Sequence, residues 1–220
     1  MKKKLLVLLV LVTLGTGLYA QQAGQRTFGA RLGLARGFWS GLDSMSWSDS
    51  TGWWEEWEQS NRFNFNVALY VAYTFTPTIS LQAELNFMIN QGFTEEWAEG
   101  DWWGTWWSDS YNWSYTSLDI PVLLRYNFFH GLLGFLVGPH ISIPIAGDDI
   151  SELNTTFGIT VGGQGLFPIG PGRLVGDLRF VADFNRLIDY SYHDPFSGDS
   201  FTMRIRRQAV ILTVGYEISF

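Results

Sequence analysis

Nine charged residues stand out because they interrupt apolar segments at regular positions. Each falls on the opposite side of a two-residue alternation from the large apolar residues around it. The nine are Arg31, Glu84, Asp119, Arg125, Asp177, Arg179, Asp183, Arg207 and Glu217. Successive side chains of a β-strand point to opposite faces, so these charges share one face of their strands. Charges of both signs on one enclosed face can pair with one another, and the alternative is a path for protons or ions.

Tryptophan is the second residue type that suggests a site. All eleven tryptophans lie in or beside residues 40–61 and 93–116, and each stretch holds five acidic residues and no Lys or Arg. The two stretches share the tetrapeptide Trp-Ser-Asp-Ser, at 47–50 and 107–110. The candidate ligand-binding residues are Trp47, Trp53, Trp54, Trp57, Trp102, Trp103, Trp106 and Trp107.

These aromatic and acidic stretches are open to several interpretations. The rings could stack on a sugar, hold a cationic group together with the carboxylates, or anchor a partner protein. Alternatively, the rings pack on each other as a cap, in hairpins that continue as strands beyond the main body of the fold. Trp39 and Trp113 lie near the ends of predicted strands. If these strands cross a membrane, both rings are expected at the level of the lipid headgroups.

The sequence gives little support for catalysis. Ser191, His193 and Asp194 are the one place where Ser, His and Asp meet, and neighbours on a loop seldom point at one target. No glycine-rich phosphate loop and no EF-hand spacing is present, and the absence of Cys excludes thiolate metal sites. We therefore predict no enzyme activity and no cofactor.

The start of the chain reads as an export signal. Lys2, Lys3 and Lys4 precede an apolar run at 5–14 that ends in small residues and Ala20. This pattern predicts a signal peptide over residues 1–20 and a mature domain over 21–220. The mature chain then has 11 Arg against 21 Asp and Glu, so we predict no nucleic-acid partner, because binding phosphate backbones needs a basic face.

Eight segments of the mature chain alternate large apolar residues with polar or small ones. They span residues 27–38, 62–75, 79–91, 117–128, 132–145, 155–167, 173–186 and 203–220. Such alternation predicts β-strands with one apolar face. The connections after the second, fourth and sixth strands are short, and those after the first, third, fifth and seventh strands are long. Short turns at one end and long loops at the other are typical of outer-membrane barrels.

The predicted fold class is therefore all-β, as a single eight-stranded antiparallel up-and-down transmembrane β-barrel. A soluble barrel around a ligand would turn its apolar face inward. Here the charges would be inside, and an arginine on the lipid face costs about 2–4 kcal/mol at mid-membrane. An eight-stranded barrel is just wide enough to be filled by side chains, so the nine charges are expected to plug it.

Four arginines fall on the outward face near the long-loop end. By parity Arg36, Arg186, Arg204 and Arg206 point outward on the first and the last two strands, which become neighbours when the barrel closes. Outward arginines at this level are expected to contact lipid headgroup phosphates.

The strand sequences resemble those of a known family. Residues 28–37, residues 81–92 and above all Leu-Asp-Ile-Pro-Val-Leu-Leu-Arg-Tyr at 118–126 resemble repeated strands of the PorT-like outer-membrane β-barrel domain family, which is similar in architecture to small OmpA-type barrels. The resemblance implies the outer membrane of a double-membraned bacterium, a lipid environment, and insertion by the barrel-assembly machinery. The closing strand would carry the assembly signal at Tyr216, Ile218 and Phe220.

The resemblance says almost nothing about mechanism. From the residues we expect a non-enzymatic barrel with a structural or surface-interaction role, in which an extracellular ligand or protein would meet the Trp-rich loops. The alternative is a narrow pore or a component of a transport or secretion machine.

Overall fold

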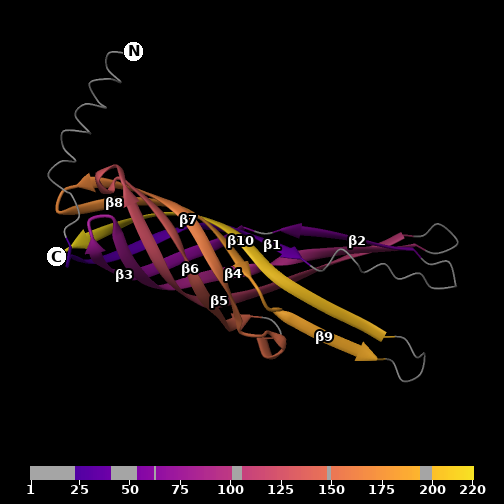
Figure 1. Cartoon of the computed structure of the whole chain (residues 1–220). Coiled ribbons are helices and arrows are strands. Elements are labelled where there is room, and N and C mark those ends of the chain that lie inside the picture. Colours follow the sequence, from indigo (N-terminus) through magenta and orange to yellow (C-terminus); the bar gives the residue numbers. More distant parts are fainter. Residues whose placement is uncertain (1–22, 41–53, 62, 101–105, 148–149, 194–199) are drawn as a thin grey trace, which may run out of the picture.

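Alternating sequences of this kind form long, paired strands in the computed structural model of the chain (Figure 1). The structure describes residues 23–40, 54–61, 63–100, 106–147, 150–193 and 200–220, and it describes only the backbone of 54–61, 93–100, 106–111, 190–193 and 200–203. The strands are β1 (Arg26–Ser40), β2 (Trp54–Asn61), β3 (Phe63–Thr76), β4 (Ile79–Gly100), β5 (Trp106–Phe128), β6 (Leu133–Gly147), β7 (Thr156–Ile169), β8 (Gly172–Asp183), β9 (Ile188–His193) and β10 (Ser200–Ser219).

Eight of these strands close into a barrel. The antiparallel order is β1-β3-β4-β5-β6-β7-β8-β10, and β10 pairs with β1 over the register from Thr27 opposite Ser219 to Ser40 opposite Arg206. β2 pairs with β4, and β9 pairs with β10, both outside this circuit. The predicted eight-stranded antiparallel barrel is confirmed.

The predicted boundaries of the long connections are wrong in part, because strands run far into them. β4 continues to Gly100, β5 begins at Trp106, and β2 and β9 lie within the predicted loops 40–61 and 187–202. In Figure 1 these strands extend well beyond one end of the barrel. The hydrogen bonds between paired strands need only two adjacent strands. Strands outside the membrane can therefore form without the apolar alternation that reveals a membrane strand.

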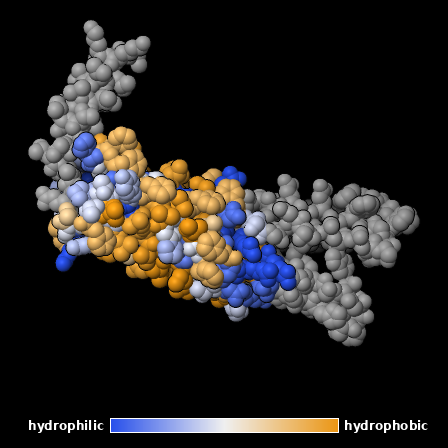
Figure 2. All heavy atoms as spheres, viewed as in Figure 1, coloured by the Kyte–Doolittle hydropathy of each residue, from blue (hydrophilic) through white to orange (hydrophobic). Residues whose placement is uncertain are grey.

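Burial alternates along the barrel strands, most regularly on β3. There the side chains of Phe63, Phe65, Val67, Leu69 and Val71 are exposed, while the residues between them are buried. Figure 2 shows the result as a hydrophobic belt across the visible face of the barrel, with hydrophilic residues toward its ends. An outward apolar band flanked by polar rims is the surface that a transmembrane barrel presents to lipid.

The short turns and the carboxyl end of the chain lie at the same end of the barrel, which we call the inner end. The turns are at Thr76–Thr78, at the 3-10 helix η1 (Phe129–Gly131) and at residues 169–172. Phe220 exchanges two backbone hydrogen bonds with Arg26, of 2.9 and 3.0 Å. The strand ends that lead into the long connections lie at the outer end, as does a second 3-10 helix, η2 (Ile150–Glu152). Neither helix in the described ranges has the length and hydrophobicity of a membrane span.

Candidate functional site

The barrel interior gathers all nine predicted charged residues. Each is buried on the inward face of its strand, and Arg173 at the start of β8 joins them. Among the described residues the interior therefore holds five arginines and five carboxylates. They form three layers along the barrel axis, which we call the inner, middle and outer layers.

The middle layer is a ring of alternating charge. Arg179 of β8 donates from Nη1 to Glu84 Oε2 at 2.7 Å and from Nη2 to Asp177 Oδ2 at 2.7 Å. Arg31 of β1 lies on the opposite side of the same two acids, 2.7 Å from Glu84 Oε2 and in direct contact with Asp177. Glu84 is on β4, and neither β1 nor β8 is a neighbour of β4. The pairs that Arg31 and Arg179 make with Glu84 therefore cross the interior of the barrel.

The outer layer is organised by Arg207 of β10. Its guanidinium lies 3.1 Å from Asp119 Oδ2 of β5 and 3.1 Å from Asp183 Oδ2 of β8. Ser117 donates to Asp119 Oδ1 at 2.7 Å, and Thr156 donates to Asp183 Oδ2 at 2.6 Å. Both carboxylates are thus satisfied by a shared cation and by hydroxyl donors.

The inner layer is centred on Glu217 of β10. Its Oε2 lies 3.3 Å from Arg125 Nη1 and accepts a hydrogen bond from the Tyr70 hydroxyl at 2.7 Å. Arg173 contacts the other carboxylate oxygen of Glu217. Arg125 also donates to Gln164 Oε1 at 3.2 Å, so this layer joins β3, β5, β7, β8 and β10.

Three further residues of this network were not predicted from the sequence to belong to it. His140 is buried with Nε2 2.8 Å from Asp183 Oδ1 and Nδ1 3.1 Å from Thr160 Oγ1. Arg173 and Tyr70 both contact Glu217. Arg173 shares the parity of Asp177 and Arg179 on β8. Tyr70 and His140 lie on strands without charged residues, and the signal there is that they alternate with the exposed apolar residues of β3 and β6.

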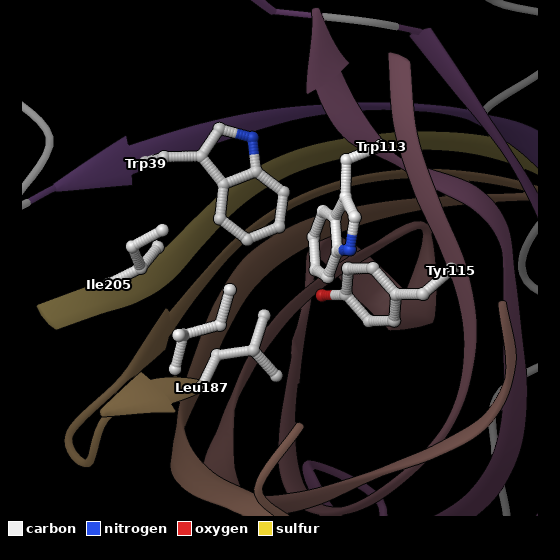
Figure 3. Packing of buried hydrophobic residues seen from close by; sticks show 6 residues of the cluster. Trp39, Trp113, Tyr115, Leu187 and Ile205 are labelled. Carbon is white, nitrogen blue, oxygen red and sulfur yellow. The ribbon is translucent and has the colours of Figure 1, made fainter. Parts of the chain in front are cut away.

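Above the outer layer the interior becomes apolar. Trp39, Trp113, Tyr115, Leu187 and Ile205 pack together with Ile188 in a buried cluster, which we call the aromatic cap (Figure 3). The Trp39 and Trp113 rings meet edge to face with centroids 6.2 Å apart. The backbone N–H of Leu187 donates to Ile205 O at 2.8 Å, and this hydrogen bond ties the connection after β8 to β10.

The cap corrects the prediction for Trp39 and Trp113, whose rings are not on the outer, lipid-facing surface where they would meet headgroups. Their side chains are 8% and 6% exposed, inside the mouth of the barrel. Trp39 shares the parity of Arg31 on β1, and Trp113 shares that of Asp119 on β5. The alternation itself therefore directs both rings inward.

The outer parts of β2, β4 and β5 carry the other tryptophans that the structure describes. Trp54, Trp57, Trp106 and Trp107 are strand residues, whereas Trp47, Trp53, Trp102 and Trp103 lie outside the described residues. Trp57 lies opposite Trp97, and Trp97 lies opposite Asp109. In the next row Glu58 lies opposite Glu96, and two rows away on the other side Glu55 lies opposite Glu99.

The four rim arginines lie on the outer surface. Arg36, Arg204 and Arg206 are exposed and Arg186 is partly exposed. Arg36 lies over the rings of Phe38 and Phe63, with Cζ 5.9 and 5.7 Å from their centroids. Arg186 and Arg204 flank one carboxylate, that of Asp189, at 2.8 and 3.7 Å.

The residues predicted to form the assembly signal lie at the end of the chain. Ile218 and Phe220 are exposed, and the Tyr216 hydroxyl donates to Ile169 O at 3.0 Å. The Ser191, His193 and Asp194 group lies outside the residues whose side chains are described. In the described part of the chain no cluster of three His, Asp or Glu residues could hold a metal ion.

Comparison with known proteins identifies the family. The family model for the outer membrane protein beta-barrel domain matches residues 19–147, which is more than half of the chain. The chain belongs to this family. It is an outer-membrane barrel, and its apolar belt faces the lipid of that membrane.

Two solved structures are similar in fold. The crystal structure of the outer membrane protein OprG from Pseudomonas aeruginosa is 12% identical, with a TM-score of 0.49 over 91% of this chain and 98% of that chain. The solid-state NMR structure of outer membrane protein AlkL in DMPC lipid bilayers is 14% identical, with a TM-score of 0.45 over 90% and 91%. A search of the curated proteins gives no match.

The ring of the middle layer makes a testable energetic prediction. Replacing Arg179 with Met leaves Glu84 and Asp177 to share Arg31 alone, and we expect this to cost about 3–5 kcal/mol of unfolding free energy. The double variant Arg179→Met with Glu84→Gln restores charge balance, so it should cost less than the sum of the two single variants. Urea titration of the refolded barrel in lipid vesicles measures all three.

The matched control is Arg26→Met, which removes an exposed arginine outside the interior network and should change stability by less than about 0.5 kcal/mol. Strict additivity of the Arg179 and Glu84 variants would contradict the coupling of these side chains in one ring.

Proposed function

We propose that this protein is a non-conducting, non-enzymatic barrel that acts through the strands it extends beyond the membrane. The observation that carries the proposal is the balance of five buried arginines against five buried carboxylates in the interior. Side chains that neutralise each other across the barrel leave no unpaired charge to attract a permeating ion. The aromatic cap adds an apolar layer above them.

Barrel size supports the same proposal. An eight-stranded barrel encloses a space that side chains can fill, and here the arginines and their partners are almost wholly buried. Opening a path would require breaking several ion pairs in succession. The alternative role as a narrow pore or part of a transport machine would need such a path.

Conductance in a planar lipid bilayer tests the non-conducting interior. We expect no conductance steps from the refolded wild-type barrel, because the ion-pair layers close it. The double variant Trp113→Ala with Leu187→Ala opens the cap only, and it should also stay silent because the charged layers remain below. Steps in the wild type would contradict the proposal and favour the pore.

The site of interaction that we propose is the outer part of β2, β4 and β5. The register puts Glu55 opposite Glu99, and both have the parity of the opposed Trp57 and Trp97. Glu58 and Glu96 are opposed as well but have the other parity. Like charges directly opposite each other across strands are destabilising. A cationic partner would relieve this repulsion, and tryptophan rings attract cations as well. Of the three ligand classes considered, the register favours the cationic one.

Binding of a labelled oligo-arginine peptide to the refolded barrel tests this assignment. We expect Glu99→Gln and Trp97→Leu each to weaken binding about two- to fivefold, since each removes one attraction for the cation. The control Glu152→Gln removes the same charge from the connection between β6 and β7 and should leave the affinity unchanged. Equal loss in all three variants, or preference for a neutral oligosaccharide over the peptide, would sink the cationic assignment.

Three finer assignments complete the proposal. The PorT-like subset of the family is supported by the strand sequence at 118–126. Residues 1–20 are our proposed signal peptide, supported by the basic start and the apolar run. The barrel-assembly machinery is the proposed partner for insertion, with Tyr216, Ile218 and Phe220 on the strand that closes the barrel as the signal.

A further inference from the structure

A polar pocket opens on the outside of the barrel at its outer rim. Its volume is about 630 Å³. It is lined by Asn154, Thr155, Asn185, Arg186, Asp189 and Arg206. These residues come from the connection between β6 and β7, the connection between β8 and β9, the start of β9 and the outer part of β10. We call this the rim pocket.

The walls of the rim pocket are tied together by hydrogen bonds. Asn185 accepts from the Phe157 backbone N–H at 2.8 Å and donates to Thr155 O at 2.9 Å. The backbone N–H of Asn154 donates to Leu187 O at 2.8 Å. Because Leu187 belongs to the aromatic cap, the pocket wall is anchored to the packed interior of the barrel mouth.

The rim pocket lies where the apolar belt ends. Phe184 is the last exposed apolar residue before Arg186, and Val210 is the last exposed apolar residue of β10 before Arg206. The exposed rings of Phe157 and Phe184 meet edge to face beside the pocket, with centroids 6.3 Å apart. A polar pocket bordered by aromatic rings at the edge of the belt fits an amphipathic molecule that lies in the membrane.

The charge of the rim pocket is positive. Arg186 donates from Nη1 to Asp189 Oδ2 at 2.8 Å, and Arg204 approaches the other oxygen of Asp189 at 3.7 Å. Arg206 makes no ion pair with any described residue. The residues that line the pocket therefore include two arginines, Arg186 and Arg206, against one carboxylate, which leaves an excess of one positive charge.

We propose that the rim pocket binds the phosphate group of a lipid of the outer leaflet. The planar guanidinium groups of Arg186 and Arg206 offer paired N–H donors that match phosphate oxygens. The acyl chains would lie along Phe157 and Phe184 in the belt. Asp189 opposes binding, because it competes with the phosphate for Arg186 and repels its negative charge. The assignment concerns the outward rim and is independent of the partner proposed for β2, β4 and β5.

Native mass spectrometry of the refolded full chain, titrated with a diphosphorylated glycolipid such as lipid A, tests the proposal. Arg186→Gln and Arg206→Gln should each weaken binding about tenfold, the loss expected for a charge-assisted hydrogen bond. Asp189→Asn should strengthen binding, which a purely structural role of these residues would not produce. A change in gel mobility on heating, equal to that of the wild type, checks that each variant still folds.

The control Arg26→Gln removes the same charge from an exposed residue at the inner end of the barrel, far from the pocket, so its affinity should match that of the wild type. Two further arms identify the ligand group. The same glycolipid without its phosphates should bind at least tenfold more weakly, and inorganic phosphate should not displace the lipid. Equal binding of the dephosphorylated lipid, displacement by inorganic phosphate, or a tenfold loss in Arg26→Gln would each overturn the proposal.

Discussion

The burial of charge inside a closed barrel is the constraint on which the rest of this structure depends. Moving an ionised side chain out of water costs several kcal/mol unless an opposite charge and further hydrogen bonds replace the lost hydration. Ten such side chains lie in this interior, and each of the five interior carboxylates contacts at least one arginine. Pairs such as Arg31–Glu84 and Arg207–Asp119 join strands that are not neighbours, so a strand that left its place would expose unpaired charge to an apolar surrounding.

The same constraint explains the division between the inside and the outside of the barrel. The side-chain period of a strand is two, so placing charges inward leaves the intervening residues outward, where only apolar side chains suit the lipid. The belt in Figure 2 is therefore the complement of the interior network. At the outer end the interior loses its charges and is filled by the aromatic cap, while the outward face loses its apolar residues and carries arginines.

The alternation made the barrel and its interior charges predictable, since it reports the environment of each side chain directly. The alternation also indicates that Trp39 and Trp113 point inward. The general preference of tryptophan for the membrane surface led to the opposite prediction. The extension of β4 to Gly100 was one of the alternatives that the sequence left open, because a strand in water needs no apolar face that would decide between them. The ion-pair partners could not be read either. Arg31 meets Glu84 across the barrel, and the sequence contains no signal for contacts between strands that do not pair.

The central claim is that five arginines are locked in the interior. Side-chain Nε–H exchange measured by NMR on the refolded, ¹⁵N-arginine-labelled barrel after transfer to D₂O tests it most directly. The account predicts that Arg31, Arg125, Arg173, Arg179 and Arg207 retain their signals after those of Arg36, Arg204 and Arg206 have disappeared, with the Arg179 signal assigned from the Arg179→Met variant. Loss of all arginine signals at one common rate would mean that water reaches the interior, and would contradict the account.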